Sequence, residues 1–353
     1  MTTVTTSAPG KLFLLGEYAV LEGAPALLAA VDARVTVTVG DATDGCWHLA
    51  VPGLATPGLA SPRLASPRLA IERLALGPNG EIPDDTDDRT REALRVFDAA
   101  RSCVADVGVP PDALDVTIDS MAFSLRGRKL GLGSSAAVAV ALTSALGIAH
   151  GLGLDSSALF ALAATAHRHA QRGAGSGGDV AASVYGGLIS YTTGTTPESL
   201  GWPEGLVALA VVTGDGASTT DLMSRVGAYA MRDPSAYRTD IRRLAELAGQ
   251  ARDALGSPTD FLALASSYFD TLVELDDHAH AGIVTQRHRE LRAVAASAGG
   301  VFKTSGAGGG DLGLAFSLDG APRDDLTAGL AAAGAQVLPL DFCADGVRSE
   351  TTP

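Results

Sequence analysis

The sequence predicts an α+β fold, in which strands and helices fall into separate groups along the chain. Residues 31–39 and 114–119 alternate between apolar and polar side chains, which is typical of half-buried strands. Residues 134–150 and 156–172 are rich in small residues with helical spacing, which is typical of helices. Because strands and helices do not alternate one by one, the order favours α+β layers over a repeating β-α array.

The length of 353 residues favours two domains, because a single hydrophobic core stops growing near about 250–300 residues. The polar segment 192–203 contains glycine and proline and is the best candidate for a boundary. We therefore expect an N-terminal domain over residues 1–195 and a C-terminal domain over residues 196–353.

The first half of the chain is expected to contain strands, a surface loop and helices. Residues 4–15 are apolar around Pro9-Gly10, which predicts a strand, a bend and a second strand. Residues 53–75 carry repeated prolines that forbid a regular helix or a central strand, so they are interpreted as a surface loop. Residues 90–107 have the apolar spacing of a helix.

The second half is expected to contain a second group of strands and helices. The predicted elements are a turn into a strand over 184–191, a buried strand over 206–213, two or three helices over 219–298, a glycine loop leading into a strand over 299–318, a helix over 322–334 and a last strand over 335–342.

Composition narrows the classes of function. The net charge of −14 argues against nucleic acid and against an anionic membrane as partners, because both require a basic surface. Neither a signal peptide nor an apolar run of about 20 residues is apparent, and the three widely spaced cysteines fit reduced thiols. We expect a cytoplasmic protein that acts on a small molecule as a monomer or homodimer.

The distribution of lysine is unusual. The chain has only three lysines against 23 arginines, and Lys11, Lys129 and Lys303 each lie in a segment rich in glycine and small residues. An ammonium group is a compact charge that approaches phosphate without the planar fork of a guanidinium. These segments are therefore predicted to form one phosphate-handling site. The alternative is that lysine is depleted and the three remaining positions are coincidental.

The strongest local signal is the run Gly131-Leu132-Gly133-Ser134-Ser135-Ala136, directly ahead of a predicted helix. Glycine allows a close backbone approach, and the helix start presents free N–H groups and a positive dipole end to a phosphate. The serines can cap the helix, bind a phosphate oxygen or ligate Mg²⁺. The run lacks the Gly-Lys-Ser/Thr ending of a Walker loop and the third glycine of a Rossmann fingerprint. A plain capped helix is the alternative.

Two further glycine-rich segments carry polar residues. Residues 305–311 are too small to pack well, which favours close approach to a ligand over the alternative of a flexible connector. Residues 175–182 place Asp179 just after a glycine turn. Its carboxylate could cap a helix, or it could lie near a reacting phosphoryl group opposite Lys11.

Together these segments resemble the three motifs of the GHMP kinases, in the order and with the spacing of that family. The matching stretches here are residues 9–20, 131–137 and 303–311, and the resemblance extends from residue 7 to about residue 318. It implies an N-terminal domain resembling ribosomal protein S5 domain 2 and a C-terminal ferredoxin-like domain. It also implies that ATP and Mg²⁺ bind between the two domains.

Within the family, the basic stretch 127–130 is similar to the approach to the glycine run in phosphomevalonate kinases. That resemblance implies ATP-dependent phosphorylation of 5-phosphomevalonate to 5-diphosphomevalonate. Mevalonate kinases carry a glutamate metal ligand eleven residues before the catalytic aspartate, where this chain has Arg168. The alternatives are another small-molecule GHMP kinase, such as a mevalonate kinase, or a non-catalytic ligand-sensing member of the fold.

The resemblance assigns catalysis to Lys11 and Asp179 and leaves Ser135 as the motif residue for Mg²⁺. The residues expected to bind ATP are Lys129, Gly131, Leu132, Gly133, Ser134, Ser135 and Ala136. The residues expected to bind the acceptor, a phosphorylated mevalonate, are Lys11, Arg128, Ser176, Gly177, Asp179, Arg225, Ser305, Gly306 and Ala307. His167 and His169 are two positions apart on a predicted helix and are interpreted as ordinary surface or core residues.

Overall fold

A computed structural model describes residues 2–52, 71–109, 111, 113–125, 128–173, 175–214 and 218–353. The chain forms two compact units that interleave in the sequence. Unit 1 comprises Met1–Lys11, Ala30–Gly186 and Ala344–Pro353, and unit 2 comprises Leu12–Ala29 and Gly187–Cys343. The division into domains 1–195 and 196–353 remains a prediction.

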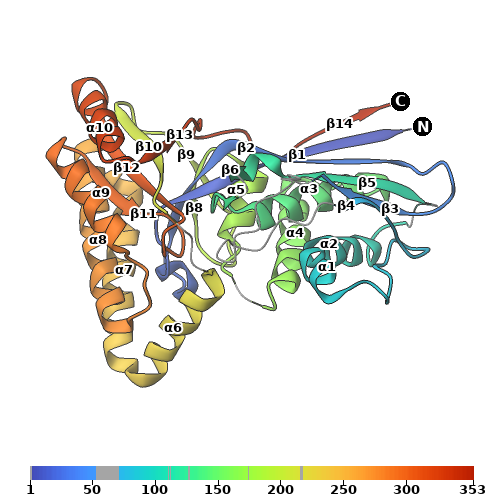
Figure 1. Cartoon of the computed structure of the whole chain (residues 1–353), viewed down its shortest axis with the longest axis horizontal. Helices are drawn as coiled ribbons and strands as arrows, with labels where there is room; N and C mark the ends of the chain where they lie inside the picture. Colours follow the sequence, from blue (N-terminus) through green and yellow to red (C-terminus); the bar gives the residue numbers. More distant parts are fainter. Residues whose placement is uncertain are drawn as a thin grey trace. The chain divides into compact units, whose positions relative to one another are not determined.

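Unit 1 is built on a sheet whose strands follow the order β14-β1-β2-β5-β3-β4. The strands are β1 (Thr3–Leu15), β2 (Ala26–Asp41), β3 (His48–Val51), β4 (Ile71–Ala75), β5 (Leu114–Asp119) and β14 (Arg348–Thr352). The end of β1 and the start of β2 belong to unit 2. Residues 3–7 of β1 pair antiparallel with β14, so the two termini lie together (Figure 1).

The helices of unit 1 pack against one another beside this sheet (Figure 1). They are α1 (Asp88–Ala93), α2 (Arg95–Ala105), α3 (Ser134–Ala149), α4 (Ser156–Ala170) and α5 (Gly178–Tyr185), with the short elements η2 (Met121–Phe123), β6 (Ser124–Leu125) and β7 (Arg128–Lys129). Helix α3 contacts α2, α4 and α5 and is buried over most of its length. A helix buried on all sides needs small apolar residues around its whole circumference, which explains its composition.

Unit 2 contains an antiparallel sheet in the order β11-β12-β10-β13, against which α8, α9 and α10 pack. These elements are β10 (Leu206–Val212), β11 (Val301–Thr304), β12 (Leu312–Leu318), β13 (Gln336–Leu338), α8 (Pro258–Ala279), α9 (Gln286–Ser297) and α10 (Ala321–Ala332). Phe302, Leu291 and Leu326 are fully buried in the core between the sheet and these helices.

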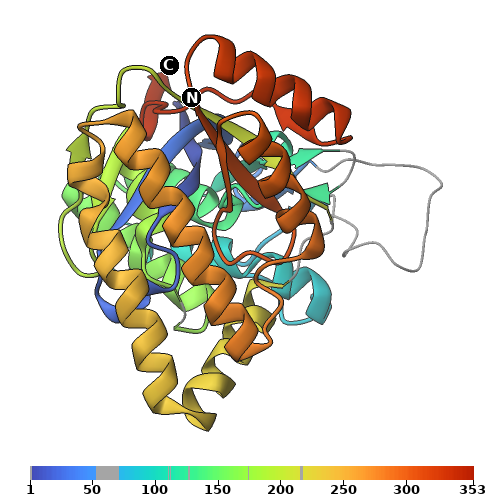
Figure 2. The same cartoon turned by 90° about the vertical axis from the view of Figure 1, so that its left-hand side faces the viewer.

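The rest of unit 2 comprises η1 (Ala19–Glu22), β8 (Leu188–Tyr191), β9 (Glu198–Leu200), α6 (Thr219–Arg232) and α7 (Pro234–Ala254). Strand β8 pairs with β9 and with residues 26–29 of β2. Helix α7 runs beside α8 (Figure 2). Each long helix here starts at a side chain that accepts a backbone hydrogen bond, Asp233 for α7 and Ser257 for α8, which satisfies a donor of the first turn.

The structure confirms the predicted α+β class and most predicted elements. The strand expected over 31–39 lies within β2, and the strands expected over 114–119 and 206–213 are β5 and β10. The two helices that follow the glycine run are α3 and α4, within two residues of the predicted ends. Strongly periodic segments were therefore identified correctly.

The predicted bend at Pro9-Gly10 is wrong, because β1 is continuous. The Pro9 carbonyl accepts a hydrogen bond from Ser183 Oγ at 2.8 Å, and the Lys11 amide donates to the Leu132 carbonyl at 2.9 Å. Proline fits an extended strand where its missing N–H is not needed for pairing. Residues distant in the sequence therefore provide the hydrogen bonds of the Pro9 carbonyl and the Lys11 amide, which the sequence alone does not reveal.

Three other boundaries differ from the prediction. Residues 71–75 of the predicted loop form β4, whereas residues 53–70 lie outside the described part of the chain. The helix predicted over 90–107 is interrupted at Leu94, which separates α1 from α2. In the part of residues 219–298 that the structure describes there are four helices, α6 to α9, instead of two or three.

The third glycine segment and the C-terminus hold strands that the prediction omits. Strand β11 precedes the glycine loop, and β14 follows the strand that was expected to end the fold. All residues of β14 are exposed, so the strand has no apolar alternation by which a sequence pattern could detect it.

Candidate active site

Lys11 and Asp179 face one another within unit 1. Lys11 lies on β1, and Asp179 lies in the first turn of α5. The distance from Lys11 Nζ to Asp179 Oδ2 is 3.4 Å, with side chains 6% and 32% exposed. The nearly buried ammonium is thus neutralised in part by a carboxylate that remains accessible, and the carboxylate lies opposite Lys11 as expected.

Gly133 allows the glycine run to approach this pair. A Cβ atom at Gly133 would lie 2.8 Å from Lys11 Cε and 3.5 Å from Asp179 Oδ2, and the φ angle of Gly133 is +77°. A side chain would collide with the lysine, and the left-handed backbone is unfavourable for other residues. Glycine is therefore required here, and residues 11, 133 and 179 meet at one place.

The start of α3 lies at the same place. Gly133 is the N-cap residue, and within the described residues no side chain caps the helix. Ser134 and Ser135 occupy its first turn and are half-buried. The open positive end of a long helix beside a lysine ammonium is suited to an anionic group such as phosphate.

His167 contacts the Ser135 hydroxyl. His167 Nε2 lies 3.1 Å from Ser135 Oγ, and the imidazole reaches it from α4. Burial lowers the pKa of His167, while the charge of Asp179 opposes this shift and the charge of Lys11 adds to it. His167 is thus part of the site that contains Lys11 and Asp179.

The sequence does contain a signal for His167. Buried alanines at positions 163, 166 and 170 mark the inner face of α4, and position 167 completes the i, i+3, i+4, i+7 pattern of that face. Arg168 and His169 are both exposed. The arginine at the position of the mevalonate kinase glutamate therefore does not take part in the contact with Ser135.

The other predicted residues of unit 1 are placed as follows. Ser176 is buried, and its Oγ accepts a hydrogen bond from the Gly178 amide at 3.2 Å. Gly177 is the N-cap of α5, with φ +87°. Lys129 is exposed on β7. The side chain of Arg128 and the whole of Gly127 lie outside the described residues.

Lys303 is not available to a phosphate group, so this part of the prediction is wrong. Within unit 2 its side chain is fully buried, and its Nζ forms an ion pair with Glu17, which is 2% exposed. Nζ also donates to the Thr304 carbonyl. Burial lowers the pKa of Lys303, and the neighbouring Glu17 opposes this shift. Lys303 joins the first and third motifs inside the core of the unit.

The rest of the third motif is held by hydrogen bonds to residues near the end of β1. Ser305 Oγ accepts a hydrogen bond from the Phe13 amide and donates to the Phe13 carbonyl, both at 3.0 Å. Tyr18 donates to the Ala307 carbonyl at 2.6 Å. These contacts leave one lone pair on the Ser305 hydroxyl for a ligand.

Two glycines of this loop have different reasons to be glycine. A Cβ atom at Gly308 would lie 2.4 Å from the Ile283 carbonyl oxygen, so packing on this backbone explains Gly308. Gly306 has a φ angle of +77° and open space where a Cβ atom would lie.

Arg225, on α6, is exposed and donates to the Ala281 carbonyl at 3.1 Å. Arg225 is therefore available at the surface and Gly306 is half-buried, whereas Gly308 is buried, as Lys303 is.

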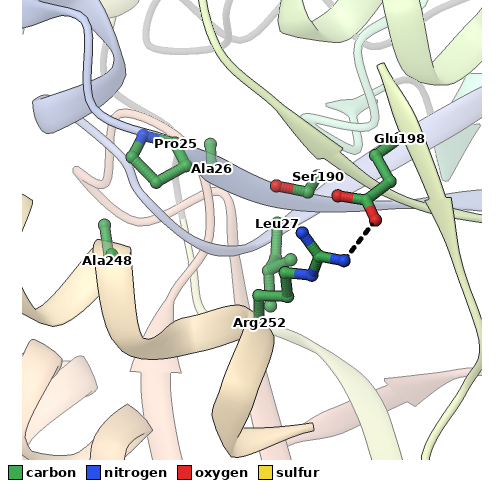
Figure 3. A pocket seen from close by; sticks show the side chains of 8 residues that line it. Pro25, Ala26, Leu27, Ser190, Glu198, Ala248 and Arg252 are labelled. Atoms are coloured by element: carbon green, nitrogen blue, oxygen red, sulfur yellow. Dashed lines mark ion pairs between the residues drawn. The ribbon is translucent and has the colours of Figure 1, made fainter.

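Two pockets among the described residues contain none of the predicted site residues. A pocket of about 200 Å³ in unit 2 is lined by Pro25, Ala26, Leu27, Ser190, Glu198, Ala248, Gly249 and Arg252 (Figure 3). Arg252 and Glu198 form an ion pair across it at 2.7 Å (Figure 3). A second pocket, of about 660 Å³ in unit 1, is lined by arginines and acids that largely pair with one another. Paired charges of this kind do not mark a ligand site.

The protein oxygen available at this site fits a cation that binds together with a nucleotide. Among the described residues, no three His, Cys, Asp or Glu side chains cluster so as to hold a metal ion. Mg²⁺ in phosphate-transfer sites usually keeps several waters and takes one or two protein oxygens together with substrate phosphates. The Ser135 hydroxyl, next to an open helix start, fits such a partial set.

Comparison with known proteins identifies the family. A sequence model of the GHMP kinase N-terminal domain matches residues 93–187, which include the glycine run and Asp179. Phosphomevalonate kinase from Streptomyces sp. (strain CL190) is 32% identical, over 98% of this chain and 98% of that protein. The chain belongs to the GHMP kinase family. A GHMP kinase is an ATP-dependent phosphotransferase that acts on a small molecule.

Other members of the family are also similar to this GHMP kinase over their full length. Mevalonate kinase from Thermococcus onnurineus (strain NA1) is 28% identical, over 98% of each chain. The structure of Streptococcus pneumoniae phosphomevalonate kinase in complex with phosphomevalonate and AMPPNP superimposes with a TM-score of 0.76 at 20% identity. That superposition covers 96% of this chain and 99% of the other. The likeness confirms the α+β GHMP kinase fold. None of the described helices is both long and apolar enough to span a membrane.

Proposed function

We propose that this GHMP kinase transfers the γ-phosphoryl group of ATP to 5-phosphomevalonate and forms 5-diphosphomevalonate. The observation that carries the proposal is the Lys11–Asp179 pair at the glycine run, in a chain that is 32% identical to a phosphomevalonate kinase over 98% of its length. The exposed Arg168, at the place of the mevalonate kinase glutamate, supports the same choice of acceptor.

The start of α3 is proposed to bind the ATP phosphates. The run Gly131–Ala136 combines two glycines of positive φ, Gly131 and Gly133, with the amides of a helix that no described side chain caps. Such an arrangement can place several N–H groups on one phosphate. Lys129, directly before the run and exposed on β7, adds a positive charge that suits a nucleotide tail.

Ser135 is proposed as the protein ligand of Mg²⁺. When bound, the metal ion neutralises charge on the phosphate oxygens of ATP. Its other ligands would be phosphate oxygens and water, because the described residues around Ser135 provide no cluster of acids.

Lys11 is proposed to stabilise the charge that develops on the transferred phosphoryl group. Its ammonium is held in place by Asp179 and is nearly buried, so it needs little rearrangement during the reaction. Phosphoryl transfer depends on positioning and charge neutralisation more than on covalent chemistry. The γ-phosphorus–oxygen bond to ADP breaks as a bond to the acceptor oxygen forms.

Asp179 is proposed to orient the acceptor and Lys11. A phosphate monoester has a second pKa of about 6, so at neutral pH the attacking oxygen is already ionised and a strong general base is unnecessary. A carboxylate that is one-third exposed and salt-bridged to lysine is suited to an orienting role.

The remaining acceptor contacts are proposed on each unit separately. In unit 1 they are Arg128, Ser176 and Gly177, at the hairpin before the glycine run and at the start of α5. In unit 2 they are Arg225, Ser305, Gly306 and Ala307. The backbone of residues 305–307 is anchored by Phe13 and Tyr18, which makes it a rigid surface for a ligand.

A mevalonate kinase is the second candidate, because the chain is 28% identical to the Thermococcus onnurineus enzyme over 98% of its length. Mevalonate offers a hydroxyl instead of a phosphate oxygen. A hydroxyl must lose its proton during transfer, which would require Asp179 to act as a base.

A panel of acceptors separates the two candidates. Purified enzyme, ATP and Mg²⁺ are incubated with mevalonate or with 5-phosphomevalonate, and the products are identified by mass spectrometry. The expected result is a diphosphate product from 5-phosphomevalonate and none from mevalonate, with Lys11→Ala as the inactive control. Efficient conversion of mevalonate, with 5-phosphomevalonate left unchanged, would contradict the proposal.

A further inference from the structure

His167 is a polar residue of the site that the proposed mechanism does not use. It lies on the inner face of α4, among the small buried residues Ala163, Ala166 and Ala170. Helices α3 and α4 are in contact with one another. The small neighbours let the two helices approach closely enough for the imidazole to reach the first turn of α3.

The contact with Ser135 has a chemical consequence. A serine hydroxyl carries one proton and two lone pairs. The oxygen can offer a lone pair to a cation only if the proton points elsewhere, and His167 Nε2, at 3.1 Å from Ser135 Oγ, provides an acceptor for that proton. In the opposite arrangement, with Nε2–H donating to the oxygen, His167 would occupy one of the two lone pairs and leave the hydroxyl proton free to turn toward the cation.

We propose that His167 is a positioning residue that accepts the Ser135 hydroxyl proton and thereby directs the Ser135 oxygen toward the cation of a bound nucleotide. The proposal rests on the role of Ser135 proposed above and is independent of the identity of the acceptor. It gives the Ser135 hydroxyl an imidazole partner, one position before Arg168, whose side chain is exposed.

The neighbouring His169 provides a matched control. It is the same residue type on the same helix, two positions further on, but it is exposed. Its ring Nδ1 lies 3.9 Å from Cys103 Sγ, and among the described residues it is His167, not His169, that contacts the Ser135 hydroxyl. Replacing His169 by Ala therefore makes the same change of residue type and of helix propensity on α4 without affecting the serine.

The test measures cation binding directly. Mn²⁺, used as a paramagnetic substitute for Mg²⁺, is titrated into the enzyme with AMPPNP and no acceptor, and the free ion is followed by electron paramagnetic resonance. We expect His167→Ala to weaken Mn²⁺ binding about tenfold, which corresponds to the loss of one hydrogen bond at this site. His167→Gln, whose side-chain oxygen can accept the same proton, should recover most of the affinity, and His169→Ala should leave it unchanged.

A double-mutant comparison separates positioning from packing. If His167 acts through Ser135, then His167→Ala should cause no further loss in a Ser135→Ala background. Equal losses in the two backgrounds, unchanged Mn²⁺ affinity in His167→Ala, or no recovery with Gln would each overturn the proposal. Should His167→Ala fail to fold, His167→Leu and His167→Gln allow the same comparison. Because no acceptor is present, the result does not depend on whether 5-phosphomevalonate is the substrate.

Discussion

Replacing Lys303 by Met should destabilise the protein far more than loss of an ordinary surface charge. Lys303 is fully buried and Glu17 is 2% exposed, and the two form an ion pair in unit 2. Lys303 Nζ donates to Glu17 Oε1, and among the described residues the buried Glu17 Oε2 has no hydrogen-bond partner. Removing the ammonium therefore leaves a carboxylate enclosed without its counter-ion.

The size of the effect follows from this burial. Breaking a buried ion pair by removing one partner costs about 3–5 kcal/mol, because the remaining charge stays desolvated. Replacing both charges together by apolar groups of similar size is often close to neutral. We therefore expect Lys303→Met to lower the free energy of unfolding by about 3–5 kcal/mol, and Glu17→Leu with Lys303→Met to restore most of that loss.

Tryptophan fluorescence during urea unfolding can measure this effect in unit 2. The chain has two tryptophans, and Trp202, in unit 2, donates to the Leu206 carbonyl and packs against Phe342. In a Trp47→Phe background the signal reports on unit 2 alone. Transition midpoints and slopes of the single and double variants then give the coupling free energy between residues 17 and 303.

Arg252→Met is the matched control within the same unit. Arg252 and Glu198 also form an ion pair, but their side chains are 61% and 45% exposed. Surface pairs of this kind contribute about 0–1 kcal/mol. If Lys303→Met costs no more than Arg252→Met, or if the double variant is as unstable as Lys303→Met, the argument from burial is refuted.

Three further predictions concern the site and a buried histidine. Lys11→Ala should lower kcat roughly 10²- to 10³-fold while ATP affinity, measured by calorimetry, stays within a few fold; an equal loss of ATP affinity would refute the role of Lys11. Gly133→Ala should lower kcat by at least about tenfold, because its Cβ would lie 2.8 Å from Lys11 Cε, whereas Gly151→Ala, in open space at a similar positive φ, should affect stability alone. Burial lowers the pKa of His288 to about 4, and the unfolded value is about 6.5, so the unfolded state binds more protons between these values. Stability should therefore fall by about 2 kcal/mol from pH 7 to pH 5 through this group, and in urea titrations His288→Gln should lack that part of the pH dependence.

The sequence predicted the helices and strands in which side chains of one kind recur at a regular interval. The alternating residues of β5 and the small-residue helices α3 and α4 reflect local burial, which each segment shows on its own. Strand β14 carries no such pattern, because it is exposed throughout and is defined by its pairing with β1. The sequence did not predict a continuous β1 for a related reason, because the backbone around Pro9-Gly10 is hydrogen-bonded to residues that are distant in the sequence.

The candidate site was predictable in part, because glycine and charged residues were concentrated in three segments. The approach of Lys11, Gly133 and Asp179 was expected, and their distances agree with it. Lys303 was misassigned because its segment looks the same as the other two. Whether an ammonium faces a ligand or a buried Glu17 depends on packing that no local pattern reports.

By itself, the sequence determined the α+β class, the glycine turns and the family to which the chain belongs, since composition, period and motif order are properties of the chain alone. The tertiary structure decided which lysine reaches the site and which is enclosed, and it brought His167 of α4 onto Ser135 of α3. These outcomes depend on contacts between residues that are 32 to 286 positions apart. Burial and pairing at such separations are set by how the elements pack, and a linear pattern does not contain that information.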